Sequence, residues 1–138
     1  MSELKLQKTE LMARDGTPVR LVYDEESDIL EIFFGENSAA TGIELTDYIV
    51  LRLDRKAKRV LSLMLLHFSI LSEQTEYGPR SFLLDKLERL PDDLREVVLR
   101  LLTSLPVSQF LKLSHLQSTP HTFTPFAYVE SQPMMAYA

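Results

Sequence analysis

The chain has 138 residues, of which 45% are hydrophobic and 25% charged, and its formal net charge is −5. This length and composition suit one globular domain with a modest core. The acidic balance disfavours non-specific binding to nucleic acid, and the absence of cysteine excludes disulfides, thiolate catalysis and cysteine–zinc sites.

The first residues and the longest apolar segment bear on where the protein is located in the cell. The start, "MSELKLQKTE", is polar and does not resemble a signal peptide. The longest apolar segment, "LSLMLLHFSIL", is too short to span a bilayer. We therefore expect a cytoplasmic protein without a membrane partner.

Three zones divide what we expect to be a single domain over residues 1–138. Residues 9–71 are rich in strand patterns, residues 80–113 are helical in pattern, and residues 114–138 form an aromatic tail of low charge. No internal repeat is visible.

The strand-rich zone shows the alternation of half-buried strands. Asp15-Gly16 separates two such segments, as in a short hairpin. The segments "DILEIFFG" and "YIVLRLD" alternate apolar and polar residues, and "RVLSLMLLHFSIL" is apolar on both faces. Because short connections join these segments, the zone predicts an antiparallel meander of about four or five strands.

Two helices are predicted after the strands. The segment "PDDLREVVLRLLTSLP" carries the apolar stripe of an amphipathic helix, which predicts a helix over 92–105. The segment "RSFLLDKLERL" predicts another over 81–90. Together they would form a helical hairpin that covers one face of the sheet, which gives an α+β fold.

An acidic segment, "VYDEESDILEIFFG", lies where a turn must join two strands. It contains Asp24, Glu25, Glu26 and Asp28. These residues suit a solvated turn, but oxygen ligands of this type also suit magnesium or calcium, and a paired acid and base is a third interpretation. No ligand ladder of the EF-hand kind follows, so we expect no cofactor, no catalytic residue and no metal site beyond the weak candidates Asp24, Glu26 and Asp28.

A basic segment, "RLDRKAKR", follows two strands later. It supplies four candidate partner-binding residues, Arg55, Lys56, Lys58 and Arg59. In a simple meander the acidic and basic loops would lie at the same end of the sheet, on the order of 10 Å apart. That is about one Debye length, so the loops would partly neutralise each other or form a dipolar rim that orients a partner.

Part of the strand-rich zone resembles a known family. The segment "YDEESDILEI" resembles the opening motif of the small bacterial family called domain of unknown function 2283, and the similarity continues through "ELTDYIVLRLD" and "RVLSLMLLHFS". It covers about residues 19–69. The matching positions are Tyr23, Asp24, Asp28, Leu30, Ile32, Asp54 and Ser69; Ser62 and Met64 replace the family's glycine and glutamate.

The resemblance implies a small sheet-rich fold without established catalytic residues. Some members resemble antitoxin partners in size and acidity. The replacement of the family's glutamate by Met64 argues against an activity that depends on that glutamate.

Other motifs are sparse. His67, His115 and His121 have no spacing typical of a metal site. A helix-turn-helix over 80–113 would balance its basic residues with acids, which again disfavours nucleic acid.

The tail differs in kind from a disordered terminus. From Leu113 onward the only formally charged residue is Glu130, and the segment contains Phe123, Phe126 and Tyr128. Pro125 restricts a strand to a sheet edge. We expect "FAYV" to add to an edge, either on its own chain or on a second copy in a homodimer, and deletion of residues 119–138 to lower stability or change the oligomer.

These patterns favour a non-catalytic binding or regulatory module that acts through protein–protein contacts. One alternative is an antitoxin-like protein that masks a basic toxin. The other is a metal-dependent hydrolase that uses Asp24, Glu26 and Asp28.

Overall fold

The computed structural model describes residues 6–71, 74–75, 78–79, 82–119 and 122–129, with side chains described for 6–71 and 84–112. Its main element is a six-stranded sheet in the order β1-β2-β3-β6-β5-β4, in which every neighbouring pair is antiparallel. The strands are β1 (Leu6–Met12), β2 (Pro18–Asp24), β3 (Ile29–Phe34), β4 (Thr41–Glu44), β5 (Ile49–Asp54) and β6 (Arg59–Leu66).

The predicted hairpin and strand alternation are confirmed. The turn between β1 and β2 uses Gly16 at a φ of +89° and an Asp15 carboxylate that accepts the Thr17 amide at 3.1 Å. Along β3, Leu30, Ile32 and Phe34 are buried and the residues between them are half-buried. The strand that the sequence missed is β4, at the edge of the sheet.

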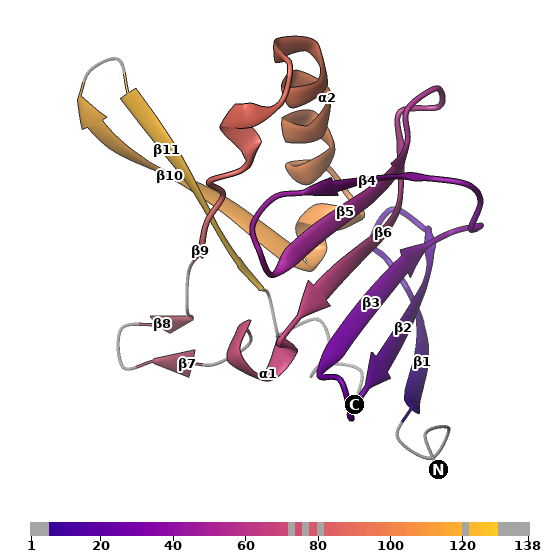
Figure 1. Ribbon diagram of the computed structural model, residues 1–138. Helices are drawn as coiled ribbons and strands as arrows, with labels where there is room; N and C mark the ends of the chain where they lie inside the picture. The colour runs from indigo at the N-terminus through magenta and orange to yellow at the C-terminus, as the bar shows by residue number, and fades with distance from the viewer. Residues whose placement is uncertain (1–5, 72–73, 76–77, 80–81, 120–121, 130–138) are drawn as a thin grey trace.

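The strand order is not that of a simple meander. Two three-stranded meanders, β1-β2-β3 and β4-β5-β6, are joined where β3 pairs with β6. In this pairing Ile29 at the start of β3 lies opposite Leu66 at the end of β6. The turn before β3 and the turn before β6 therefore lie at opposite ends of the sheet (Figure 1). The predicted shared rim of acidic and basic loops is wrong.

One of the two predicted helices is present. Helix α2 spans Asp92–Leu102, so the prediction over 92–105 is confirmed except for its last turn. The prediction over 81–90 is wrong: β9 (Phe82–Leu83) is followed by the 3₁₀ turn η2 (Leu87–Arg89). A helix would direct the Lys86 amide to the carbonyl of residue 82. Here that amide donates to the Leu45 carbonyl at 3.2 Å instead.

Ion pairs hold η2 against the main sheet. The Lys86 ammonium lies 2.5 Å from a Glu44 carboxylate oxygen and 2.9 Å from Asp47. These hydrogen bonds raise the pKa of Lys86 above its ordinary value. The remaining short elements are α1 (Phe68–Leu71), β7 (Gln74–Thr75), β8 (Gly78–Pro79) and η3 (Val107–Gln109).

The core lies between one face of the main sheet and α2 with η3 (Figure 1). Val98 and Leu102 of α2 are buried there, and the Phe34 and Phe110 rings lie 5.9 Å apart. The opposite face is called the open face below. In β2, β3, β5 and β6 its apolar side chains are half-buried and do not belong to the core cluster; they are Val22, Ile29, Phe33, Val50, Met64 and Leu66. Toward β1 the register places on the same face the exposed Leu6 and Met12 and the charged Lys8, Glu10 and Arg20.

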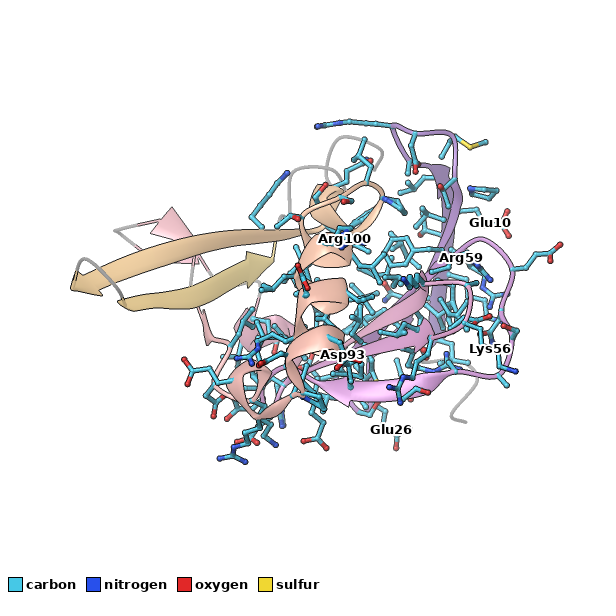
Figure 2. The ribbon with its side chains drawn as sticks, turned by 90° about the horizontal axis from the view of Figure 1, so that it is seen from above. Glu10, Glu26, Lys56, Arg59, Asp93 and Arg100 are labelled. Carbon is cyan, nitrogen blue, oxygen red and sulfur yellow. The ribbon has the colours of Figure 1, made fainter. Side chains whose placement is uncertain are left out.

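The predicted strand in the tail is present and pairs within its own chain. Strands β10 (Leu111–Thr119) and β11 (Thr122–Val129) form a hairpin, and β9 pairs with β11 at Phe126 and Ala127. Pro125 lies where β11 has a partner on the β10 side only, as expected for proline. The β10–β11 ribbon reaches away from the main sheet and α2 (Figure 1 and Figure 2).

Two further sequence predictions concern the aromatic and histidine side chains of the tail and the crossing of a membrane. The side chains of Phe123, Phe126 and Tyr128, like those of His115 and His121, lie outside the described side chains. Within the described residues, the longest helices fall short of the length and apolar character that crossing a membrane requires.

Candidate functional site

Three residues from distant parts of the sequence meet at one end of the main sheet. The Tyr23 hydroxyl donates to an Asp28 carboxylate oxygen at 2.7 Å. The Ser69 hydroxyl donates to the other oxygen at 2.6 Å, and the Ser69 amide donates to the same carboxylate at 3.0 Å. Tyr23, Asp28 and Ser69 are three of the residues on which the family resemblance depends.

Local backbone geometry builds this cluster. Asp24 begins the turn, because its carboxylate accepts the Glu26 amide at 3.1 Å. Asp28 ends the turn in the left-handed region at a φ of +58°, and its carbonyl accepts the Phe68 amide at 2.9 Å. The acidic turn, residues 24–28, is thereby docked onto α1, and only Glu25 and Glu26 of its acids are fully exposed.

The protonation of the cluster follows from its hydrogen bonds. Partial burial alone would raise the pKa of Asp28, but the bonds from Ser69 and Tyr23 outweigh it and lower the pKa below the ordinary 3.8. The bond to Asp28, with burial, raises the pKa of Tyr23 to about 12. At neutral pH a carboxylate thus accepts bonds from a protonated phenol, and neither group titrates near the pH that general acid–base catalysis requires.

The weak metal candidates are not arranged as a coordination shell. Asp24 accepts backbone amides, Asp28 accepts Tyr23 and Ser69, and Glu26 is exposed. Among the residues that the structure describes, no group of three or more His, Asp or Glu side chains could hold a metal ion. A cavity of about 460 Å³ adjoins the cluster and is lined by Gln7, Thr9, Leu21, Tyr23, Leu30, Phe68 and Ser69.

The basic turn, residues 54–58, has the same backbone arrangement as the acidic turn. The Asp54 carboxylate accepts the Lys56 and Ala57 amides at 3.0 and 3.1 Å, and Lys58 ends the turn at a φ of +53°. Arg55, Lys56 and Lys58 are exposed, and none forms an ion pair with another described residue. The turn and residues 38–41 border a cavity of about 530 Å³.

Arg59 stands apart from the other predicted cations. Its guanidinium donates to the Phe34 carbonyl at 3.0 Å and to the Glu36 carbonyl at 2.8 Å. These bonds fasten the turn after β3 to the start of β6. Arg59 is thus used for structure, whereas Arg55, Lys56 and Lys58 are exposed.

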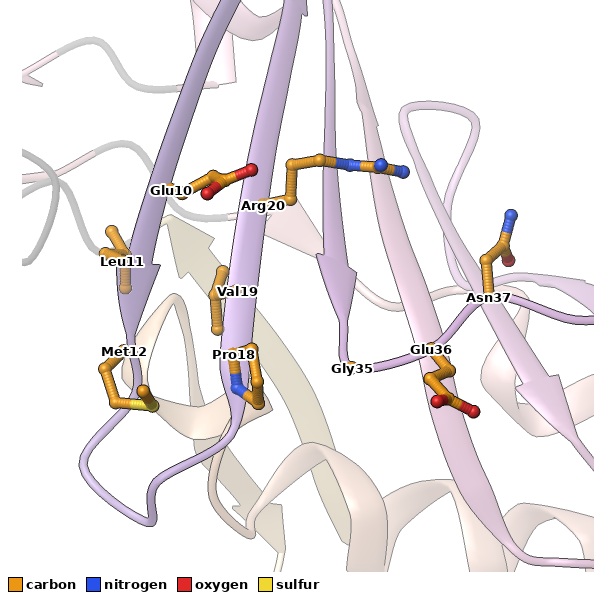
Figure 3. Close-up of a pocket in the computed structure, with 9 residues that line it drawn as sticks. All are labelled: Glu10, Leu11, Met12, Pro18, Val19, Arg20, Gly35, Glu36 and Asn37. Atoms are coloured by element: carbon orange, nitrogen blue, oxygen red, sulfur yellow. The ribbon is translucent and has the colours of Figure 1, made fainter.

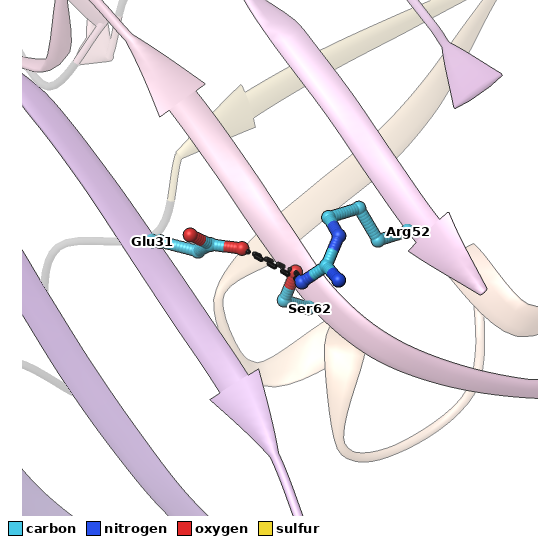
Figure 4. A network of polar contacts seen from close by, with 3 residues as sticks. All are labelled: Glu31, Arg52 and Ser62. Atoms are coloured by element: carbon cyan, nitrogen blue, oxygen red, sulfur yellow. Dashed lines mark hydrogen bonds and ion pairs between the residues drawn. The ribbon is translucent and has the colours of Figure 1, made fainter. Parts of the chain in front are cut away.

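A polar network that sequence reasoning missed lies at the centre of the open face. An Arg52 nitrogen is 3.1 Å from both a Glu31 carboxylate oxygen and the Ser62 hydroxyl (Figure 4). Ser62 donates to the same Glu31 oxygen at 2.7 Å and is fully buried. The signal that could have found it is one arginine, one glutamate and one serine at outward positions of otherwise apolar strands.

A cavity of about 750 Å³ opens at the end of β1 and the start of β2, beside the turn after β3 (Figure 3). Its charged residues are mixed: Glu10, Arg20 and Glu36. The Arg20 guanidinium stacks over the Phe33 ring at 4.5 Å.

Comparison with known proteins adds no relative. No family model matches the chain, and no match was found among curated proteins or solved structures. The resemblance to domain of unknown function 2283 therefore stays an expectation from the sequence.

Proposed function

We propose that this chain is a non-catalytic binding module that acts through protein–protein contacts, and that the β10–β11 ribbon is the element that meets the partner. One observation carries the proposal. The ribbon reaches away from the body of the protein, and residues 113–129 contain no Asp, Glu, Lys or Arg.

The ribbon has the properties of a recognition element. A projecting strand pair is normally protected by charged side chains, since its unpaired amides and carbonyls otherwise invite further strands. In the described residues, β10 is paired with β11 on one side and with no strand on the other. A partner strand that adds to β10 would gain main-chain hydrogen bonds, and the aromatic residues would supply contact area.

The rest of the molecule supports a binding role over catalysis. The most connected polar cluster contains Asp28 and Tyr23, whose pKa values lie far from neutrality on either side. The hydrolase alternative would need Asp24, Glu26 and Asp28 to converge, whereas the two aspartates already accept other donors. Their hydrogen bonds account for the acidic turn as structure.

Affinity capture from a lysate of the producing cells tests this proposal. The bait would be the wild-type chain, the ribbon variant Ser114→Lys/Gln117→Lys, and the control Ser38→Lys, which adds a cation at an exposed loop position. We expect a protein partner with the wild type and the control, and its loss with the ribbon variant. A partner retained equally by all three baits would contradict the role of the ribbon.

The antitoxin-like alternative is favoured by one observation, the exposure of Glu25 and Glu26 at one end of the sheet. A basic partner would be attracted to these carboxylates. In the same capture experiment, Glu25→Gln/Glu26→Gln should then release the partner while the ribbon variant retains it.

A further inference from the structure

We propose that two copies of this chain associate through their open faces, with the acidic turn of each copy at the basic turn of the other. This inference goes beyond the ribbon-mediated binding proposed above, because it concerns the opposite side of the main sheet. The occupant of that surface is a second copy of the chain.

The two charged turns of one copy lie far apart. The acidic turn carries four carboxylates, and the basic turn carries three cations and one carboxylate. They lie at opposite ends of β6, a strand of eight residues, which corresponds to about 25 Å. That distance exceeds the Debye length of about 8 Å at cellular salt, so the turns do not neutralise each other within one copy.

Symmetry limits how two copies can meet. In this dimer the two sheets stack face to face, and a two-fold axis lies midway between them. If the axis runs perpendicular to the strands, it reverses the strand direction in the second sheet. It places the acidic end of each copy over the basic end of the other. An axis along the strands would bring like charges together. Charge complementarity therefore selects the first arrangement.

The acidic and basic turns of the two copies meet with a sideways offset of about one Debye length. The acidic turn joins β2 to β3 and the basic turn joins β5 to β6, so the two turns differ by two strand positions across the sheet, or about 10 Å. Sheets that stack face to face also rotate by about 30° relative to each other, which changes this offset by a comparable amount.

The open face also suits an interface between two copies. At the centre of this face apolar side chains flank the network of Glu31, Ser62 and Arg52, in which the two charges are already paired. The other charges of the face, Lys8, Glu10 and Arg20, lie on β1 and β2, at its edge. Covering a paired charge costs less than covering a single one. Six strands at a spacing of about 4.8 Å and a length of about 20 Å project roughly 600 Å², which approaches the roughly 800 Å² per partner of a standard interface.

Charge reversal tests the pairing of the turns. The variants are Glu25→Lys/Glu26→Lys, with two basic turns; Arg55→Glu/Lys56→Glu, with two acidic turns; and the combined variant, in which the poles are exchanged. Sedimentation equilibrium at low and high salt would give the dissociation constants. All of the changed residues are exposed and none belongs to the core cluster, so circular dichroism should show unchanged folding.

We expect the wild type to dimerise and each single reversal to weaken the dimer by at least about tenfold. The combined variant should recover the wild-type affinity, and an equal mixture of the two single reversals should form a heterodimer. A monomeric wild type, a dimer indifferent to reversal, or a combined variant that fails to recover would each overturn the proposal.

Two more variants locate the surface. Met64→Lys on the open face should abolish the dimer, whereas Ile70→Lys, at an exposed apolar residue of α1, should leave it intact. The ribbon variant Ser114→Lys/Gln117→Lys should also dimerise normally. Dimerisation lost in the ribbon variant and kept in Met64→Lys would assign the interface to the ribbon and reject the open face, so this proposal and the proposed function can fail separately.

Discussion

Two acids of one turn have opposite roles, and only their surroundings distinguish them. Asp28 accepts hydrogen bonds from Tyr23 and Ser69, whereas Glu26 extends into solvent. The sequence correctly predicts a turn here from the residue types. It does not reveal the role of Asp28, because Ser69 is 41 residues away and reaches it only once β3 has paired with β6.

Asp28→Asn should destabilise the fold at neutral pH by about 1–3 kcal/mol, because the amide would face the Ser69 donors with a donor of its own. The folded-state pKa of Asp28 lies below 3.8. The stability it contributes is therefore present above the unfolded-state pKa and is lost as the pH falls through the folded-state pKa. Urea unfolding at pH 7 and at acid pH should show the difference from wild type shrinking below pH 3.8. Glu26→Gln is the control, and an equally large effect there would contradict the assignment.

Tyr23→Phe should cost about 1 kcal/mol at neutral pH, through loss of its bond to Asp28. The pKa of Tyr23 is raised from 10.0 to about 12. Its contribution is complete below pH 10 and is lost as the pH rises toward 12. An ultraviolet titration of the folded protein should contain a tyrosinate component near pH 12 that disappears in Tyr23→Phe and persists in Tyr128→Phe. Persistence in both variants would assign that component to another tyrosine.

At the scale of elements, the two charged turns are versions of one design. Each begins with an aspartate whose carboxylate accepts a hydrogen bond from the backbone amide two residues later. Each ends with a residue in the left-handed region. The two meanders thus form a structural repeat that the sequence conceals, since residues 24–28 are acidic and residues 54–58 are mostly basic. Neither turn uses its central side chains to hold the fold. One turn can therefore be acidic and the other basic without a change in backbone structure.

Lys58→Gly should stabilise the protein by about 0.5–1 kcal/mol, because glycine adopts a positive φ without the strain of a side chain. Asp28→Gly changes the corresponding position of the acidic turn. This variant should destabilise the protein, because the free energy gained by relieving strain is smaller than that lost with the hydrogen bonds of Asp28. Thermal unfolding of the two variants measures the contrast, with Ala57→Gly as the control for added chain flexibility. Stabilisation by both changes would show that the Asp28 bonds contribute little.

Helix prediction succeeded and failed for identifiable reasons. The apolar stripe of α2 is long enough that the burial of Val98 and Leu102 fixes the helix against the sheet. The segment 81–90 has similar spacing, but it pairs with β11 at Phe82 and Leu83 and bonds to Leu45 through the Lys86 amide. Contacts with distant segments thus override a local preference, which no local pattern reveals.

At the scale of the whole molecule, the body and the ribbon are different kinds of structure. Among the side chains that the structure describes, which end at Lys112, the core cluster of buried residues runs from Ala13 to Leu111, the first residue of β10. In the main sheet, alternation predicted every strand except β4. The pairing of β3 with β6, across the whole second meander, was not predictable from short connections. That pairing separates the charged turns and creates the open face.

The last prediction compares two truncations. A chain that ends at Leu111 loses the ribbon beyond its first residue but keeps every member of the core cluster among the described side chains, and it should unfold cooperatively with a melting temperature within a few degrees of wild type. A chain that ends at Ser118 keeps most of β10 without β11, its only strand partner in the described residues. Both edges of β10 are then unpaired, and unpaired edges promote aggregation. We expect this longer chain to be the less stable and less soluble of the two, as measured by thermal unfolding and light scattering. Equal loss of stability in both would show that the ribbon is part of the folding unit.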